Sequence, residues 1–253
     1  MDHDSVLNEL VELSRYLGDP NRDYAILGEG NTSARVDGDI FYVKASGTTL
    51  ATIERDGFVA VSASKVLRIL DDENAGDDEV SEVLKESLVD PSETRRPSVE
   101  TMLHAILLSV PEYRFVGHTH PVHTNMLLCS KVAEEAMTGR LFPDQIVSMG
   151  PKPVFVPYVD PGLPLAREVK WRFEAFVEAE GMLPKAIVMQ NHGLITMGET
   201  PKAVTSATDM CEKASRITVG AYAVGGPNFL AHHEVERIAN RPDEHYRLKS
   251  IAG

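Results

Sequence analysis

Apolar residues recur every three or four positions in several stretches of the chain, a spacing that predicts amphipathic helices. Ser98 comes directly before one of these stripes, so we expect its hydroxyl to cap that helix. Pro121 and Pro201 each suit the first turn of a helix, where a missing N–H costs nothing. The expected helices are residues 5–17, 64–70, 99–110, 122–129, 169–177 and 201–224.

Shorter runs of apolar or alternating residues predict strands. A tight turn, Asn191-His192-Gly193, separates the last two of them. Strands alternate with helices, yet some neighbouring strands are joined by short turns, which favours a mixed sheet covered by helices. The chain shows no linker or internal repeat, so we expect one domain over residues 1–253. The expected strands are residues 39–45, 58–61, 115–116, 146–148, 154–156, 186–189 and 194–197.

Composition places the chain among ordinary globular proteins: 253 residues, 43% of them hydrophobic and 25% charged. Its longest apolar runs, such as Ala105–Leu108, fall far short of the ~20 residues that span a bilayer. The first residues lack the features of a signal peptide. Two cysteines, Cys129 and Cys211, form no disulfide framework. We therefore expect a cytoplasmic protein with no membrane partner.

The formal net charge is −13, which argues against binding to a nucleic-acid backbone. Much of the excess lies in Asp71–Glu86, where eight acidic residues accompany Lys85 alone. Such a run most often forms a solvated face, and that is the interpretation given to it here. A small anionic substrate remains compatible with this charge, because local donors act over shorter distances than the overall field.

Candidate chemistry begins with His118 and His120. On an extended segment, residues two apart project to the same face, so both imidazoles can converge on one ion. A zinc site of the catalytic kind needs about three protein ligands and an open position. His192, in the tight turn, is a candidate for the third. The alternatives are two hydrogen-bonded histidines at a strand end and an ordinary residue at a hairpin tip.

Glu100 lies in the first turn of an expected helix, beside its apolar stripe. A partly desolvated carboxylate can act as a metal ligand or as a general base. The alternative is an acid placed there by the helix dipole.

Two polar loops, residues 28–33 and 46–48, offer amide and hydroxyl donors of the kind that bind phosphate. Neither loop matches a dinucleotide fingerprint or a Walker loop, and plain turns are the alternative.

Five segments occur in a specific order: Gly-Asn-Thr-Ser from Gly30, Lys-Ala-Ser-Gly-Thr from Lys44, Pro-Ser-Val-Glu from Pro97, His-Thr-His-Pro from His118, and Asn-His-Gly from Asn191. Together they resemble the class II aldolase/adducin family over roughly residues 5–225, with 226–253 as a C-terminal extension. The resemblance implies a layered α/β/α fold with a mixed, largely antiparallel sheet. Its zinc-dependent members include fuculose- and rhamnulose-phosphate aldolases, whereas adducin heads lack the metal histidines that this chain keeps.

The resemblance also implies residue roles. It gives His118, His120 and His192 as ligands of Zn²⁺, with another divalent ion as the alternative, and Glu100 as the catalytic acid–base group. Val99 departs from the family pattern, which often has a second serine there, and Arg95 or Arg96 could supply the missing contact. The implied phosphate-binding residues are Gly30, Asn31, Thr32, Ser46, Gly47, Thr48 and Ser98.

The expected activity is metal-dependent cleavage of a ketose phosphate, such as a deoxyketose 1-phosphate, to dihydroxyacetone phosphate and an aldehyde through a metal-stabilised enediolate. Alternatives are an epimerase, a dehydratase or a sugar-acid decarboxylase at the same metal site, or a non-catalytic adducin-like interaction module. Aspartate is common in the epimerases where this chain has Glu100. The resemblance further implies a homotetramer, and Tyr222 is a guess for the second acid or base.

Overall fold

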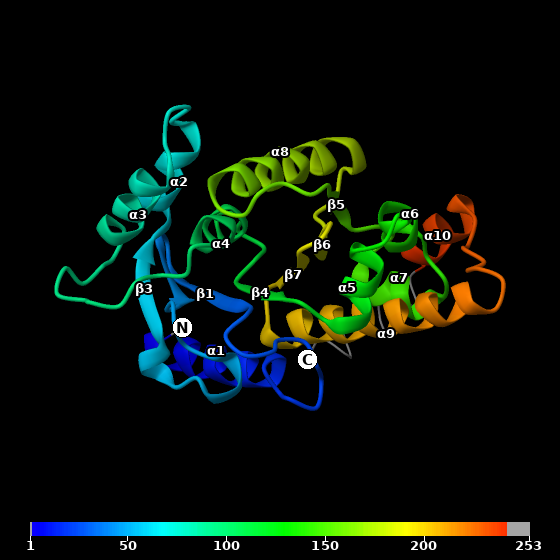
Figure 1. Ribbon diagram of the computed structural model, residues 1–253, viewed down its shortest axis with the longest axis horizontal. Coiled ribbons are helices and arrows are strands. Elements are labelled where there is room, and N and C mark those ends of the chain that lie inside the picture. The colour runs from blue at the N-terminus through cyan, green and yellow to red at the C-terminus, as the bar shows by residue number, and fades with distance from the viewer. Residues whose placement is uncertain (1, 242–253) are drawn as a thin grey trace.

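The computed structural model describes residues 2–241, and within this range the chain forms one seven-stranded sheet between layers of helices (Figure 1). The strand order is β3-β2-β1-β4-β7-β6-β5, and every neighbouring pair is antiparallel except β5 with β6. The strands are β1 (Asn31–Asp37), β2 (Ile40–Lys44), β3 (Phe58–Ser62), β4 (Phe115–Thr119), β5 (Val154–Val156), β6 (Ala186–Met189) and β7 (Gly193–Gly198).

Helices cover both faces of this sheet. The α-helices are α1 (His3–Leu17), α2 (Ala63–Leu67), α3 (Asp77–Glu86), α4 (Thr101–Leu108), α5 (Val122–Leu128), α6 (Ala133–Thr138), α7 (Pro143–Met149), α8 (Leu163–Glu180), α9 (Pro201–Ala223) and α10 (His232–Ala239). Three short 3₁₀ helices are η1 (Leu50–Thr52), η2 (Arg55–Gly57) and η3 (Arg68–Asp71).

The two faces bury separate apolar clusters because alternate strand residues point to opposite sides. On one face α2, α4 and α8 pack over sheet residues such as Val43, Val116 and Ile195. On the other face α1 packs against Ala34 and Phe115, and α9 lies beside it (Figure 1). The expected mixed, largely antiparallel α/β/α architecture is thus confirmed.

Two local predictions need correction. Residues 146–148, expected as a strand, lie inside α7. The helix expected from residue 99 begins at Thr101, so Glu100 rather than Ser98 occupies its cap position. In the acidic stretch, where the sequence indicates only a solvated face, the chain forms the helix α3 with Val80, Val83 and Leu84 buried. The apolar pair Ile146-Val147 fits a strand or a buried helix turn equally well, which explains the first error.

Within residues 2–241, no helix has the length and apolar character that crossing a membrane requires. The last part of the expected C-terminal extension, residues 242–253, lies outside the described residues.

The central strands β1, β4 and β7 bring distant parts of the sequence together. Asn31 of β1 pairs with His118 of β4, and His118 in turn pairs with Ile195 of β7. Directly paired residues share a face, so Asn31 and His118 point to the side covered by α4. The candidate site forms at this end of the three strands.

Candidate metal and acid–base site

Three histidines meet where β4 and β7 come together. His118 lies in β4, His120 directly follows that strand, and His192 lies in the turn between β6 and β7. The Nε2 atoms of His118 and His120 are 3.0 Å apart. One ligand atom from each of the three rings lies within 4.8 Å of the others. The structure therefore brings together the three histidines expected from the sequence.

A glycine makes this close approach possible. A Cβ added at Gly193 would lie 2.5 Å from the His120 ring and 2.7 Å from the Thr119 carbonyl oxygen. Both distances are too short for any side chain. The Asn-His-Gly turn thus needs its glycine so that the strand can pass beside the rings.

The outer ring nitrogens show how two of the histidines are protonated. His118 Nδ1 lies 3.0 Å from the Leu194 carbonyl oxygen, and His120 Nδ1 lies 3.0 Å from Glu29 Oε2. Because these partners are acceptors, each Nδ1 carries the hydrogen and donates it. With the hydrogen on each Nδ1, the Nε2 atoms are the ring nitrogens that face each other, an arrangement that a cation between them would stabilise.

Burial keeps His118 neutral. Its ring is 1% exposed, and this desolvation lowers its pKa from 6.5 to about 3, although the charge of Glu100 acts in the opposite direction. A metal ligand must be deprotonated, so a neutral ring is ready to bind. His192 Nδ1 is buried without a hydrogen-bond partner among the described residues. The His192 carbonyl accepts a hydrogen bond from Asn125 Nδ2 at 3.0 Å.

Glu100 lies against the histidines. Its Oε1 is 3.0 Å from His192 Nε2 and its Oε2 is 3.4 Å from His118 Nε2. Burial alone would raise the pKa of Glu100, but His118, His192 and a hydrogen bond from Asn31 outweigh it and hold the pKa well below its usual range. The group is therefore a carboxylate at neutral pH.

These residues fit a divalent metal. Three imidazole nitrogens with one adjacent carboxylate form a donor set that zinc and similar ions accept, and the facing Nε2 atoms leave their lone pairs for it. The unpartnered Nδ1 of His192 is a further indication that the hydrogen bonds of the described residues do not complete this cluster.

The expected anion-binding residues divide into two groups. Ser46 and Gly47 are exposed, and Ser46 lines a cleft of about 720 Å³ together with Val99, Arg95 and Arg96. The amide of Ser46 donates to the Arg96 carbonyl at 2.8 Å, so its hydroxyl is the group left for a ligand. Thr48 is partly buried and its hydroxyl donates to the Ala45 carbonyl at 2.8 Å.

The second group turns inward. Asn31 and Ser98 are buried and hydrogen-bond each other at 3.2 Å. The carbonyl oxygen of His118 would lie 2.8 Å from a Cβ placed at Gly30. The absence of a side chain at Gly30 therefore lets the end of β4 pass close to this residue. Thr32 points to the opposite face, where its hydroxyl shares a 2.5 Å hydrogen bond with Ser14 of α1. The geometry thus directs the Thr32 side chain away from the site, because residues 31 and 32 alternate across the sheet.

The two arginines at the cleft differ. Arg95 makes two hydrogen bonds to Glu93, from Nε to Oε1 at 2.9 Å and from Nη2 to Oε2 at 2.5 Å. This pairing occupies its guanidinium. Arg96 is exposed at the same cleft, and Val99 adds only an exposed apolar side chain.

Sequence reasoning missed three residues near the histidines. Glu29 contacts His120, as described above. Lys44, 4% exposed, donates from Nζ to the Gly28 carbonyl at 3.2 Å, and burial lowers its pKa while Glu100 opposes this. His104, on α4, hydrogen-bonds Asn31. A polar residue within an otherwise apolar helix stripe was the available signal for His104. Tyr222 lies on α9 and is 38% exposed.

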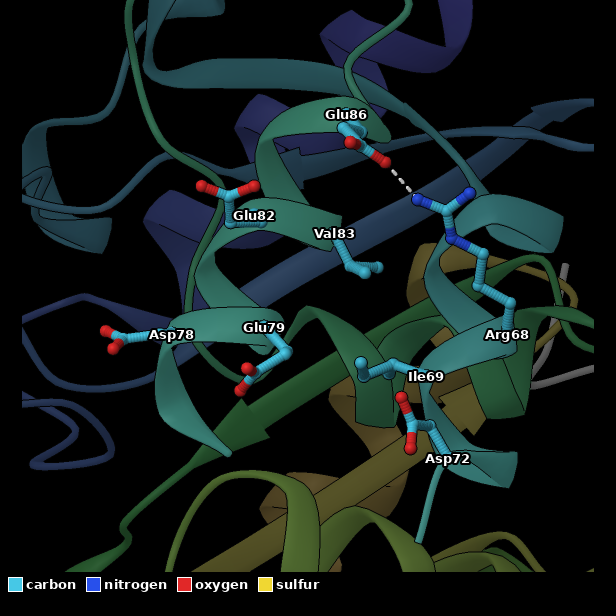
Figure 2. A pocket seen from close by; sticks show the side chains of 8 residues that line it. All are labelled: Arg68, Ile69, Asp72, Asp78, Glu79, Glu82, Val83 and Glu86. Carbon is cyan, nitrogen blue, oxygen red and sulfur yellow. Dashed lines mark hydrogen bonds and ion pairs between the residues drawn. The ribbon is translucent and has the colours of Figure 1, made fainter. Parts of the chain in front are cut away.

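A second concentration of charge lies between η3 and α3. This acidic hollow, of about 580 Å³, is lined by Arg68, Ile69, Asp72, Asp78, Glu79, Glu82, Val83 and Glu86. Figure 2 shows Arg68 directed toward Glu86, with which it pairs, while Asp78 and Glu82 point away from Arg68. No residue of the histidine cluster lines it. The solvated face expected for this stretch is confirmed by the exposure of its acidic side chains.

Known proteins share this sequence pattern and fold. YuxG, an uncharacterized oxidoreductase of Bacillus subtilis, is 31% identical over 214 residues, which cover 80% of this chain but 28% of YuxG. A methylthioribulose-1-phosphate dehydratase of Microcystis aeruginosa is 26% identical, with 77% of this chain and 86% of that protein covered. A 3-oxo-tetronate 4-phosphate decarboxylase of Haemophilus influenzae is 24% identical, with coverage of 92% and 95%.

Solved structures agree. The N-terminal class II aldolase domain of a conserved Thermoplasma acidophilum protein superposes with a TM-score of 0.69 at 29% identity, covering 87% of this chain and 96% of that domain. An L-fuculose 1-phosphate aldolase superposes with a TM-score of 0.69 at 17% identity, covering 98% of both chains. The family model described as the class II aldolase and adducin N-terminal domain matches residues 8–219. The chain therefore belongs to the class II aldolase/adducin family.

Proposed function

We propose that this protein is a divalent-metal-dependent lyase that cleaves a carbon–carbon bond next to the carbonyl group of a phosphorylated ketose. One observation carries the proposal: three histidine nitrogens converge within 4.8 Å beside a carboxylate, Glu100, that contacts two of the rings. An adducin-like interaction module would not need three converging histidines beside a carboxylate.

His118, His120 and His192 would hold the ion, and zinc is the ion that this donor set suits best. When bound, the ion supplies Lewis-acid stabilisation of negative charge on the carbonyl oxygen of the substrate. Glu29 keeps the His120 ring oriented with Nδ1 as donor, and the Leu194 carbonyl does the same for His118.

Glu100 performs the proton chemistry. As a carboxylate at neutral pH, it can carry the proton that goes on and off the carbon next to the carbonyl group, while the hydroxyl on the carbon that becomes the aldehyde gives its proton to a second base as the bond between the two carbons breaks. Its low pKa keeps it in the accepting form, and its 14% exposure limits competition from water.

The anionic end of the substrate would lie in the cleft bounded by Ser46, Val99 and Arg96. Its donors are the Ser46 hydroxyl and the Arg96 guanidinium, which can form two charge-assisted hydrogen bonds with a phosphate group. Arg95 is less available because Glu93 occupies it. Local donors of this kind can bind an anion despite the net charge of −13.

The family resemblance supports a homotetramer with each site near a subunit boundary. A tyrosine from a neighbouring copy would then handle the aldehyde half of the reaction.

A second candidate function is the dehydration of a ketose 1-phosphate. It is favoured by the 26% identity to a methylthioribulose-1-phosphate dehydratase, which is covered over 86% of its length. The same carboxylate would remove the proton next to the carbonyl group, but the substrate would lose water and keep its carbon chain.

The test is a product analysis. Purified protein, loaded with zinc and separately with manganese or cobalt, is incubated with a panel of ketose 1-phosphates and phosphorylated sugar acids, and products are followed by mass spectrometry and an aldehyde-trapping assay. Release of an aldehyde and dihydroxyacetone phosphate supports the aldolase. Loss of water without cleavage identifies the dehydratase, and loss of carbon dioxide a decarboxylase. Turnover that is equal in Glu100→Gln protein would refute the proposed site.

A further inference from the structure

A chain of hydrogen bonds runs from the interior of the protein to Glu100. Asn31 Nδ2 donates to Glu100 Oε2 at 2.6 Å. The other end of the same amide, Oδ1, is hydrogen-bonded to His104 Nε2. His104 Nδ1 in turn lies 2.6 Å from the hydroxyl of Ser33. The four side chains come from β1, α4 and the cap position of α4.

The chemistry of the partners fixes the direction of every bond in this chain. A carboxylate can only accept, so the Asn31 nitrogen faces Glu100 and the Asn31 oxygen faces His104. That oxygen can only accept, so His104 carries its hydrogen on Nε2. His104 Nδ1 must then accept the hydrogen of the Ser33 hydroxyl. One arrangement of the hydrogens satisfies all three contacts.

Burial makes this arrangement rigid. His104 is 1% exposed and Asn31 is 3% exposed, so water cannot replace a lost partner. Desolvation lowers the pKa of His104 to about 4, which keeps the ring neutral and leaves Nδ1 as an acceptor at physiological pH. The second hydrogen of the Asn31 amide is directed to Ser98 Oγ at 3.2 Å, so both of its donors are occupied.

This arrangement changes the role expected for Asn31. An amide that is bonded to Glu100, Ser98 and His104 has no hydrogen left for a phosphate group. Its hydrogen bond to Glu100 instead orients the carboxylate. If His104 were absent, the amide could turn over and present its oxygen to Glu100, which would repel the carboxylate.

We infer that His104 is a positioning residue: through Asn31 it fixes the orientation of the Glu100 carboxylate toward the histidine cluster. His104 touches neither the three histidine ligands nor the cleft, and it acts on the reaction only through Asn31. The inference rests on the proposed function in so far as Glu100 carries the proton.

The first test does not need activity. In metal-free protein labelled with ¹⁵N-histidine, the His104 ring is expected as the neutral form protonated at Nε2 near pH 7. His104 is assigned by the loss of its signals in a His104→Gln variant. A neutral ring protonated at Nδ1, or a charged ring, would overturn the inference even if the enzyme were fully active.

The second test compares two substitutions at the same position. His104→Leu fills the space without a donor, so kcat is expected to fall by about 10- to 100-fold while KM and bound metal change little. His104→Gln offers an amide hydrogen near the place of Nε2, so kcat is expected to return to within about threefold of the parent protein.

A matched control separates positioning from loss of stability. Ile106→Ala truncates a buried residue of the same helix that lies outside the hydrogen-bonded chain. It is expected to lower the melting temperature at least as much as His104→Leu while keeping kcat. Equal kcat in His104→Leu and the parent, or an equal loss in Ile106→Ala, would overturn the inference. A parent protein without turnover on any substrate would instead overturn the proposed function, and the ¹⁵N result would still decide the role of His104.

Discussion

The histidine site and the acidic hollow both contain several ionisable side chains, but these side chains differ in their exposure to solvent and in their hydrogen-bond partners. At the histidine site the side chains range from His118, which is 1% exposed, to Glu29, which is 32% exposed, and the outer ring nitrogens have definite acceptors, as in the contact of His120 Nδ1 with Glu29. In the hollow, Asp72 follows η3 and the other acids project from α3, and the Arg68–Glu86 pair has both side chains more than half exposed. Charges that water can reach interact weakly, whereas desolvated charges perturb one another strongly.

The comparison shows why number of charges is a poor guide to function. The hollow has more acidic groups than the histidine site, but these groups are exposed to solvent and make only local contacts. Glu79, for example, accepts a hydrogen bond from the Gly76 amide at 2.9 Å and so caps its own helix. The pKa values of His104 and His118, by contrast, are lowered to about 4 and about 3 because burial removes these rings from water.

The largest effect is expected from removing a ligand. His118→Ala should reduce bound metal to near zero and turnover to background, because two remaining histidines cannot complete the donor set. Metal content by mass spectrometry and turnover on the substrate identified above are the measurements. As a control, the double variant Asp78→Asn/Glu82→Gln in the hollow should keep its metal. If the hollow variant lost the ion and His118→Ala kept it, the assignment of the two regions would be reversed.

Replacing the base comes next. Glu100→Gln keeps the size of the side chain but cannot accept a proton, so kcat should fall by roughly 10²–10⁴-fold while most of the metal stays bound. Glu82→Gln makes the same chemical change on an exposed side chain and should leave kcat unaltered. Near-normal turnover in Glu100→Gln would show that this acid serves the helix end and that the base lies elsewhere.

The two arginines of the cleft should differ by an intermediate amount. Arg96→Ala is expected to lower kcat/KM by about 10- to 100-fold, the equivalent of about 1.5–3 kcal/mol for a charge-assisted contact with the anion. Arg95→Ala should change kcat/KM by less than about twofold, since Glu93 already occupies that guanidinium. Steady-state kinetics decide the matter. An unchanged value for Arg96→Ala would leave the anion to the Ser46 turn alone.

The last effect concerns the acid stability of the metal-free protein. The pKa of His104 is about 4 in the folded chain and near 6.5 when unfolded, so the unfolded state binds more protons between these values. Stability should therefore fall as the pH drops from about 6.5 to 4, by up to about 1.4 kcal/mol per pH unit from this group. Urea denaturation at several pH values measures the slope.

Substitutions at the histidine site and in the hollow should also differ in their effect on the pH dependence of stability. His104→Gln should flatten the slope, whereas Glu79→Gln in the hollow should leave it unchanged above pH 4.5. The hydrogen bond from Gly76 lowers the pKa of Glu79 below 4.5, so its contribution is lost only at lower pH. An equally steep slope in His104→Gln protein would contradict the expected burial effect.

Much of the fold could be predicted because its elements follow simple periods. Helices α1, α8 and α9 carry an apolar stripe, and β6 and β7 are short apolar runs around a glycine turn. β1 escaped prediction because its buried first residues, Asn31, Thr32 and Ser33, are polar. Hydrogen bonds to Ser14, Ser98 and His104 offset the cost of burying these polar side chains. No periodicity in the sequence reveals such bonds.

The site could be predicted only in part for the same reason. The spacing of His118 and His120 suggests a shared ion directly, because it depends on strand geometry alone. The contact of Glu29 with His120 and the contact of His104 with Asn31 depend on how the loop before β1 and helix α4 are placed on the sheet. These are tertiary relations between positions far apart in the chain, so the sequence and the family resemblance place Asn31 with the anion-binding residues and do not reveal its bond to His104.

The place of the histidines in the middle of the sheet also bears on how the chain folds. β4 pairs with β1 on one side and with β7 on the other, and both partners are distant in sequence. Such pairings form late, because closing long loops costs entropy before any contact is gained. The three rings converge only once both pairings are in register, so an ion would find its ligands assembled only in the nearly native chain. A bound ion would therefore slow unfolding of the complete sheet and would have little effect on the rate of folding.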